Sequence, residues 1–305
     1  MNNSFIFWVE RYFYNPNFFQ KIVSFFLLPL SWLYCFFMWL NFKLQKPHDF
    51  DVDIISVGNL NVGGSGKTPL VTALASRYEN VAVILRGFGR ESLGLHVVSD
   101  GKKILEDVSV SGDEAMIYAN KLPNAIVIVS EDRKQAIDKA KDMGAEIVFL
   151  DDAYSKHDIK KLDIFIESNF INNYCLPSGP YRERLWKSKE VVLLREEFDF
   201  KRKTALKDRC DKMSLITAIA RPSRLDKYLP DVVSKNYFAD HYNFSKNEIE
   251  DILKRDKSDS ALVTYKDYVK LEQFNLPLSL LDLEMEVDDK VVKYIEYYRA
   301  KNDCT

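Results

Sequence analysis

The sequence predicts an α/β protein: a parallel sheet flanked by helices, with a smaller C-terminal α/β domain and an N-terminal membrane helix. Three observations predict this fold class. After Pro47, short apolar runs alternate with segments of helical length, which is the pattern of βαβ units. The first run leads into a glycine-rich loop, and an uncharged segment occupies residues 22–40.

The apolar runs predict the strands, and three segments between them predict helices. Strands are expected at Asp53–Val57, Val81–Leu85, Ala125–Val129, Ala145–Leu150, Leu162–Ile166, Val191–Leu194, Leu215–Ile219 and Ala261–Val263. Helices are expected at Thr68–Tyr78, Asp113–Asn120 and Arg133–Met143.

Length and composition exclude several classes of protein. A chain of 305 residues is long enough for about two domains. Its 47% hydrophobic and 29% charged residues are close to globular averages, which argues against a disordered chain and against a polytopic membrane protein. The net charge of -2 provides no basic field for nucleic acid, so no nucleic-acid partner is expected.

The N-terminal segment predicts a membrane anchor within residues 1–45. Residues 22–40 carry no charge, and a helix needs ~20 apolar residues to cross a bilayer core. Pro29 is expected to kink the segment, and its aromatic side chains also suit the bilayer interface, so spanning and half-embedded orientations both remain open. The alternative is a buried core helix, which large aromatic side chains on all faces disfavour.

The rest of the chain divides into two predicted domains, residues 46–205 and residues 206–305. The boundary is placed in the stretch Glu196–Asp211, which is rich in charge and poor in apolar residues. The four cysteines, Cys35, Cys175, Cys210 and Cys304, form no Cys-x-x-Cys pair, and we expect them to be reduced, structural and intracellular.

A phosphate-binding loop is predicted directly after the first strand, within Gly58–Pro69. A strand, a glycine-rich loop, Lys-Thr and a helix are the parts of a P-loop, as in P-loop NTPases. Asn61 replaces the first glycine of the strict motif, and asparagine tolerates left-handed backbone. The alternative is a glycine-rich turn with a surface lysine. The predicted nucleotide-binding residues are Gly63, Gly64, Ser65, Gly66, Lys67 and Thr68.

A metal site is predicted where a later strand ends. Asp151 and Asp152 follow the apolar run of residues 145–150, where a P-loop protein places the acid that holds Mg²⁺, and Thr68 would contribute its hydroxyl. The alternative is an Asp pair in a simple turn. The nearest match to a guanine-reading element is Thr264–Asp267, with its lysine one position late, which favours ATP.

Several segments together resemble the tetraacyldisaccharide 4'-kinases of lipid A synthesis. They are VGNLNVGGSGKTP, LRGFGR, SGDEA, LDDAYSKH, LPSGPYRE, ADHYNF and TYKDYVKL, in this order along nearly the whole chain. The resemblance implies an inner-membrane enzyme, working at the cytoplasmic face, that uses ATP and Mg²⁺. It would phosphorylate the 4'-hydroxyl of a tetraacylated glucosamine disaccharide 1-phosphate, a lipid substrate, to form lipid IVA.

The resemblance also implies catalytic roles. Asp113 would act as the base with His241 as its partner, and Lys67 would neutralise phosphate charge. Asp113 also suits a helix N-cap, and a lone histidine is often structural. Arginine pairs well with phosphate, so substrate contacts are expected in the loops after the second strand and after Gly179, with solvated surface positions as the alternative. These candidates are Arg86, Arg90, Arg182 and Glu183.

Two segments depart from the family pattern. The usual DDGFQH is DDAYSKH here, which introduces Ala153 and displaces His157, and the usual TEKD is TYKD. Two other functions therefore stay open: a membrane-anchored P-loop NTPase without lipid phosphotransfer, and a non-catalytic lipid-binding homologue.

Overall fold

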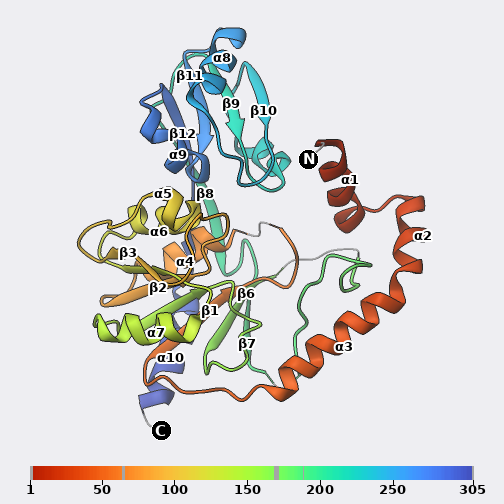
Figure 1. Cartoon of the computed structure of the whole chain (residues 1–305), viewed down its shortest axis with the longest axis vertical. Coiled ribbons are helices and arrows are strands. Elements are labelled where there is room, and N and C mark those ends of the chain that lie inside the picture. The colour runs from red at the N-terminus through yellow and green to blue at the C-terminus, as the bar shows by residue number, and fades with distance from the viewer. Residues whose placement is uncertain (1–2, 64–65, 168–171, 188, 304–305) are drawn as a thin grey trace.

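The structure, a computed structural model, describes residues 3–63, 66–167, 172–187 and 189–303 (Figure 1). The chain forms a helical arm (residues 3–44), a large domain around a seven-stranded sheet and a small domain around a five-stranded sheet. The small domain lies above the large one in Figure 1, and the arm runs along the side of both. A mixed α/β fold with a helix-flanked parallel sheet is therefore confirmed.

The large sheet is parallel except at one edge. Its strand order is β3-β4-β2-β5-β1-β6-β7, and only β3 runs antiparallel to its neighbour. The pattern of apolar runs predicted six of these strands within two residues at either end and missed β3. Their bounds are β1 (Asp53–Gly58), β2 (Val81–Leu85), β3 (His96–Asp100), β4 (Ile126–Val129), β5 (Ile147–Asp151), β6 (Leu162–Ile166) and β7 (Val191–Leu194).

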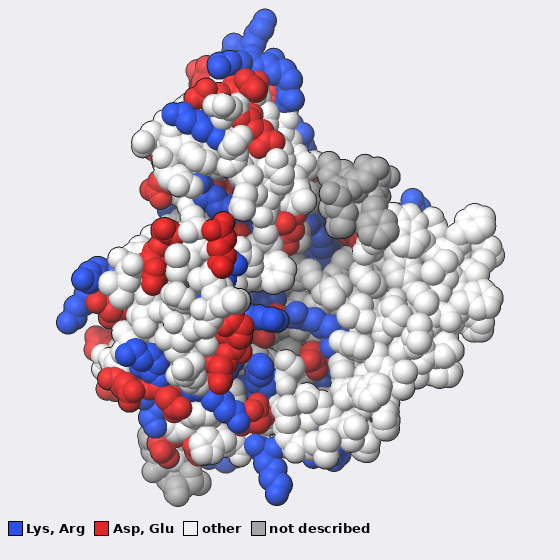
Figure 2. All heavy atoms as spheres, in the orientation of Figure 1, with Lys and Arg blue, Asp and Glu red and all other residues white. Residues whose placement is uncertain are grey.

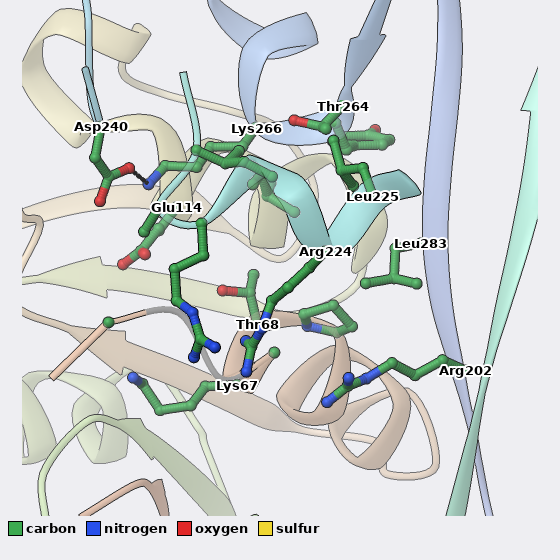
Figure 3. A pocket seen from close by; sticks show the side chains of 18 of the residues that line it. Lys67, Thr68, Glu114, Arg202, Arg224, Leu225, Asp240, Thr264, Lys266 and Leu283 are labelled. Atoms are coloured by element: carbon green, nitrogen blue, oxygen red, sulfur yellow. Dashed lines mark hydrogen bonds and ion pairs between the residues drawn. The ribbon is translucent and has the colours of Figure 1, made fainter. Parts of the chain in front are cut away.

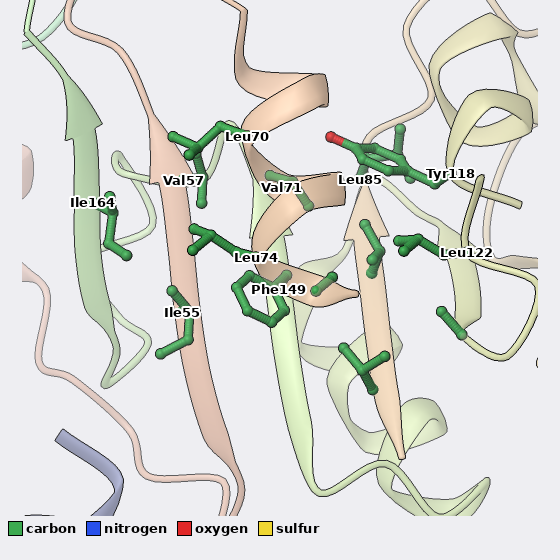
Figure 4. Close-up of a cluster of buried hydrophobic side chains, with 14 of the residues drawn as sticks. Ile55, Val57, Leu70, Val71, Leu74, Leu85, Tyr118, Leu122, Phe149 and Ile164 are labelled. Carbon is green, nitrogen blue, oxygen red and sulfur yellow. The ribbon is translucent and has the colours of Figure 1, made fainter. Parts of the chain in front are cut away.

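Helices bury both faces of this sheet, as the continuous apolar strands require. On one face, α4 (Lys67–Ala75) and α6 (Asp113–Lys121) pack over β1, β2 and β5 (Figure 4). Figure 4 shows Leu70 and Leu74 of α4 against Val57 and Phe149. On the other face lies α7 (Arg133–Asp142), and the short helix α5 (Val108–Ser111) precedes α6. The packing fixes α4 directly above the end of β1.

The small domain has a sheet of order β10-β9-β11-β12-β8. Its elements are β8 (Phe200–Lys207), β9 (Met213–Thr217), the 3-10 helix η1 (Pro222–Tyr228), β10 (Ser234–Tyr237), α8 (Lys246–Asp256), β11 (Ser260–Thr264), α9 (Tyr265–Leu271), the 3-10 helix η2 (Glu272–Phe274) and β12 (Leu278–Val287). The last helix, α10 (Asp289–Asp303), returns to the large domain, where Val291 and Ile295 join its core.

The charged stretch chosen as the domain boundary contains a strand. Residues 200–207 form β8, which pairs antiparallel with β12 along its whole length. An edge strand with a solvated face alternates charged and apolar residues, so its sequence resembles a linker. The sheets divide between β7 and β8, and the predicted boundaries at residues 45 and 205 stay a prediction.

The arm consists of three helices rather than one. They are α1 (Asn3–Tyr14), α2 (Phe18–Phe26) and α3 (Leu28–Leu44). Asn17 caps α2 through a capping box, and α2 meets α3 at Leu27 with a bend of 57°, next to Pro29 as expected. In the part of the chain that the structure describes, no single helix is long and apolar enough to cross a membrane; only the bent pair α2–α3 meets the criteria of length and composition.

One stripe of the arm packs against the loop of residues 172–184. The Ser24 hydroxyl donates to the Ser178 carbonyl oxygen at 2.7 Å, and the Ser31 hydroxyl donates to that of Cys175 at 2.8 Å. Cys35, one turn along, forms a disulfide with Cys175. The expectation of reduced cysteines was therefore wrong for this pair, because contact between the arm and the loop brings together residues that are 140 positions apart.

Candidate active site

The two domains enclose a cavity of 920 Å³ at the carboxyl ends of the parallel strands (Figure 3). This is where open α/β sheets bind their ligands. The large domain contributes the start of α4 and residues of α6, and the small domain contributes β8, η1 and the start of α9. The lining includes Gly63, Gly66, Lys67, Thr68, Glu114, Asp152, Arg182, Arg202, Arg221, Arg224, Asp240, His241 and Lys266.

The predicted phosphate-binding loop forms the floor of the cavity. Gly66 precedes the first turn of α4 with a left-handed φ of 87°, and Gly63 has a φ of 92°, conformations that glycine adopts without strain. Lys67 and Thr68 open the helix beneath the cavity, as expected. Gly64 and Ser65 lie outside the described residues.

Lys67 takes part in a network of charges with Asp152. Its Nζ atom lies 3.0 Å from Oδ1 of Asn59 and 3.6 Å from Oδ1 of Asp152. Arg182 donates to the same two residues, so this loop arginine does reach the floor of the cavity. Burial opposes ionisation of Asp152, but the charges of Lys67 and Arg182 prevail and lower its pKa. The network therefore holds a carboxylate and two cations where phosphates would bind.

Asp151 lies deeper, at the end of β5. The Tyr118 hydroxyl donates to its Oδ2 atom at 2.8 Å, whereas Oδ1 is buried and has no hydrogen-bond partner among the described residues. Burial raises the pKa of Asp151, and Lys67 only partly offsets this. Burial and the charge of Asp151 raise the pKa of the neighbouring Glu114 to about 7. Without a bound cation, the carboxyl groups of Asp151 and Glu114 both resist ionisation. A bound cation would favour their charged forms, so the pair is suited to hold one.

Asp113 and His241 meet across the two domains. The Nδ1 atom of His241, in the small domain, lies 3.1 Å from Oδ2 of Asp113, whose side chain is 4% exposed. Asp113 is the first residue of α6, which is capped by Gly112, so the N-cap interpretation is wrong. Burial would raise the pKa of Asp113, but His241, Lys266 and Lys270 lower it overall. The carboxylate is therefore held in its charged form.

Lys266 fixes the orientation of the imidazole. Its Nζ atom lies 3.0 Å from Nε2 of His241 and 2.9 Å from Oδ1 of Asp240. An ammonium group only donates, so Nε2 is the acceptor and the proton of the neutral ring is on Nδ1, facing Asp113. Burial disfavours the charge of Lys266, yet the carboxylates of Asp113 and Asp240 raise its pKa.

Three of the expected substrate-contact residues do not line this cavity among the described residues. Arg86 is exposed, and Arg90 pairs with Glu131 at 2.5 Å and donates to the Gly94 carbonyl oxygen, which ties the loop after β2 together. Glu183 lies beside Arg182 and is partly buried, and burial raises its pKa to about 7. Contacts of these residues with substrate stay predictions.

His157, in the altered DDAYSKH segment, has a structural position. Its ring packs at 5.0 Å from that of Phe42 in α3 and at 5.2 Å from that of Tyr154. Burial and the charges of Lys189 and Lys161 lower its pKa to about 3, so it stays neutral. It connects the arm to the large domain.

Glu114 and Lys266 were not predicted as site residues. Both lie within segments that carry the family resemblance. Glu114 follows Asp113 in SGDEA, and Lys266 is the lysine that TYKD has in common with the usual TEKD. The spacing of the motifs was a usable signal, but only the fold brings Lys266 to His241.

A lysine-bearing, glycine-rich loop between a strand and a helix, with carboxylates beside it at the edge of a parallel sheet, is typical of proteins that bind nucleotide phosphates. Comparison with known proteins agrees. The sequence matches the profile of the family described as Tetraacyldisaccharide-1-P 4'-kinase, LpxK, over residues 23–211 and 195–297. The chain belongs to this family.

Relatives with that name cover nearly the whole chain. The tetraacyldisaccharide 4'-kinase of Aliarcobacter butzleri is 49% identical over 93% of this chain and 94% of its own length. That of Helicobacter acinonychis is 45% identical, covering 95% and 94%. A crystal structure of LpxK from Aquifex aeolicus in complex with ATP has a TM-score of 0.71 and 24% identity, covering 90% of this chain and 99% of the other, and thus shares the fold.

We expect Lys266→Met to shift the acidic limb of the pH–activity profile to higher pH. The cation lowers the pKa of Asp113, so its removal raises that pKa, and a reaction that needs the carboxylate fails at a higher pH. Lys266→Arg keeps the charge, and Lys254→Met, at an exposed position of α8, is the control. Profiles of kcat/KM against pH measure the limb; an unshifted limb in Lys266→Met would contradict this role.

Proposed function

We propose that this protein transfers the γ-phosphoryl group of ATP to the 4'-hydroxyl of a tetraacylated glucosamine disaccharide 1-phosphate, yielding lipid IVA. One observation carries the proposal: Lys67 and Thr68 on the floor face His241 and Lys266, with Asp113 behind them, across a single cavity. A donor phosphate held on the floor would thus lie opposite the group that takes the acceptor proton.

In this mechanism the dyad of Asp113 and His241 accepts the proton of the 4'-hydroxyl: Nε2 of His241 takes the proton in place of its hydrogen bond from Lys266, and Asp113 stabilises the imidazolium that forms. The oxygen of the 4'-hydroxyl then attacks the γ-phosphorus of ATP. The bond between the γ-phosphorus and the oxygen that bridges it to the β-phosphate breaks, and ADP leaves. Phosphoryl transfer depends on positioning and charge neutralisation, which Lys67 and the backbone of the loop provide. Asp113 remains a carboxylate because His241, Lys266 and Lys270 surround it.

Mg²⁺ is the metal that these residues would hold. The described residues contain no cluster of three or more His, Cys, Asp or Glu side chains for a metal, but Mg²⁺ takes only one or two protein carboxylates beside phosphates and water. The buried Oδ1 of Asp151, which has no hydrogen-bond partner among the described residues, fits this requirement, with Thr68, Glu114 and Asp152 nearby. When bound, the ion would neutralise charge on the phosphates.

The arm would hold the enzyme in the surface of the inner membrane, on its cytoplasmic side. The stripe of α2 and α3 that contains Gln20, Ser24 and Ser31 is buried against the protein, whereas the opposite face is apolar and exposed. Figure 2 shows this outer surface almost without charge. A bent pair of helices with one apolar face suits half-embedding in the interface. A lipid acceptor could then reach the cavity without leaving the bilayer.

The competing function is an anchored NTPase that hydrolyses ATP without a lipid acceptor. The floor of the cavity and the apolar arm would serve it equally well, but the kinase is favoured by the family to which the chain belongs. Acceptor-dependent release of ADP separates the two functions.

We expect wild-type protein to transfer label from γ-labelled ATP to a tetraacyldisaccharide 1-phosphate in detergent micelles. Lys67→Ala should make no labelled lipid, and Asp113→Asn should lower kcat by ~10²–10⁴, the usual effect of losing a general base. Asp142→Asn, exposed at the end of α7, is the control. Release of ADP without labelled lipid would refute the kinase, and a wild-type rate in Asp113→Asn would remove the dyad.

Asp151→Asn should raise the Mg²⁺ concentration needed for half-maximal activity by at least about tenfold, because the amide is a poorer ligand. The amide oxygen can still accept from Tyr118, so the fold is preserved. Asp158→Asn, in the loop that follows the same strand, is the matched control. Identical magnesium titrations for Asp151→Asn and wild type would exclude Asp151 as a ligand.

Replacing Phe18, Phe19, Phe25 and Phe26 together by serine should reduce binding to phosphatidylglycerol-containing vesicles at least about tenfold. These side chains are between 67% and 76% exposed, so the loss is of membrane contact rather than of packing. Phe198→Ser, 66% exposed in the connection between β7 and β8, is the control. Co-sedimentation measures binding, and undiminished binding would place the anchoring surface elsewhere.

A further inference from the structure

We propose that three arginines of the small domain, Arg202, Arg221 and Arg224, bind the phosphate groups of the nucleotide from the side of the cavity opposite the glycine-rich loop. We call them the arginine cluster. The inference rests on the proposed kinase function and adds a second set of phosphate-binding residues to it.

The cluster faces the floor of the cavity. Arg202 lies on β8, and Arg221 and Arg224 lie at the start of η1. Figure 3 shows Arg202 and Arg224 extending from the small domain toward Lys67 and Thr68. The same cavity surface therefore holds cations from both domains.

The arginines approach the loop at its glycines. A methyl group on Gly66 would lie 3.4 Å from a terminal nitrogen of Arg202, and one on Gly63 would lie 3.9 Å from Cδ of Arg221. Gly66 precedes α4, a helix of nine residues whose free N–H groups carry partial positive charge. The guanidinium of Arg202 and the ammonium of Lys67 lie beside that terminus, and cations next to a helix N-terminus favour an anionic ligand. A polyphosphate is an anion of the required charge.

Two carboxylates of the protein lie beside the cluster. Glu10 lies 3.2 Å from Nε of Arg221, and Glu196 lies 3.0 Å from a terminal nitrogen of Arg202. Partial desolvation of the guanidinium of Arg224, together with the charges of Arg221 and Arg202, lowers its pKa to about 10. An anion bound here would relieve this repulsion.

Arg221 is also held by the arm. The ring of Tyr14 at the end of α1 lies 4.0 Å from its guanidinium, and the Tyr14 hydroxyl donates to the Val62 carbonyl oxygen in the glycine-rich loop. Substitution of Arg221 would therefore disturb the arm as well. Arg224, which reaches into the cavity from η1, is the residue to vary.

The phosphate bound by the cluster could belong to the nucleotide or to the acceptor, which carries a 1-phosphate. The distances to Gly63 and Gly66 favour the nucleotide. Calorimetry without acceptor measures how the full-length protein binds ATP and inorganic tripolyphosphate. This binding reports on phosphates of the nucleotide. The KM for the tetraacyldisaccharide 1-phosphate reports on the phosphate of the acceptor.

We expect Arg224→Met to weaken binding of both ATP and tripolyphosphate by roughly 10–100-fold, as for loss of a charged hydrogen bond. Arg224→Lys should recover part of this, and the KM for the acceptor should stay within about twofold. Arg209→Met, exposed on the same domain and outside the cavity, is the control, and unchanged melting temperatures exclude misfolding.

Unchanged ATP binding, or a raised acceptor KM with unchanged ATP binding, would overturn the proposal. Both binding measurements stand even if no lipid is phosphorylated.

Discussion

The contact between Asp113 and His241 sets the relation between the two domains. A carboxylate that is 4% exposed is costly unless it is paired, and its partners, His241, Lys266 and Lys270, all come from the small domain. The large domain alone would leave Asp113 buried and uncompensated. The loop that carries His241 adopts a left-handed φ of 59° at that residue, a conformation that costs roughly 1–2 kcal/mol for a residue with a side chain. The pairing thus holds a strained residue in place.

The cavity separates two kinds of charge. On the floor, Asp152 is balanced by Lys67 and Arg182, while Asp151 and Glu114 lie deeper and resist ionisation. On the opposite side, the arginines of β8 and η1 concentrate positive charge. This arrangement suits a ligand with a polyanionic end and a divalent cation, and His241 of the dyad lines the same cavity, where the hydroxyl of an acceptor could meet it.

The arm joins this system at two places. Its buried stripe contacts the loop of residues 172–184, which supplies Arg182 to the floor, and the end of α1 contacts the glycine-rich loop through Tyr14. The arm, which we propose to lie against the membrane, is therefore connected to the floor of the cavity by hydrogen bonds.

Much of the large domain was predictable because its strands are buried on both faces and read as continuous apolar runs. Strand β8 was not, because its exposed face makes its sequence resemble a linker, and β12 lacks a bounded apolar run. Strand β9 ends at Thr217 rather than Ile219, since the Ala218 N–H donates to Asp267 at 3.0 Å instead of to a neighbouring strand. Motifs located Lys67, Asp113 and Asp151, whereas Lys266, Arg224 and the Cys35–Cys175 bond depend on contacts between distant segments. A double-mutant cycle on kcat/KM with Asp113→Asn and His241→Asn tests the central claim, that the two residues act as one unit across the domains. The double variant should be about as slow as the slower single variant, and effects that multiply independently would contradict the account.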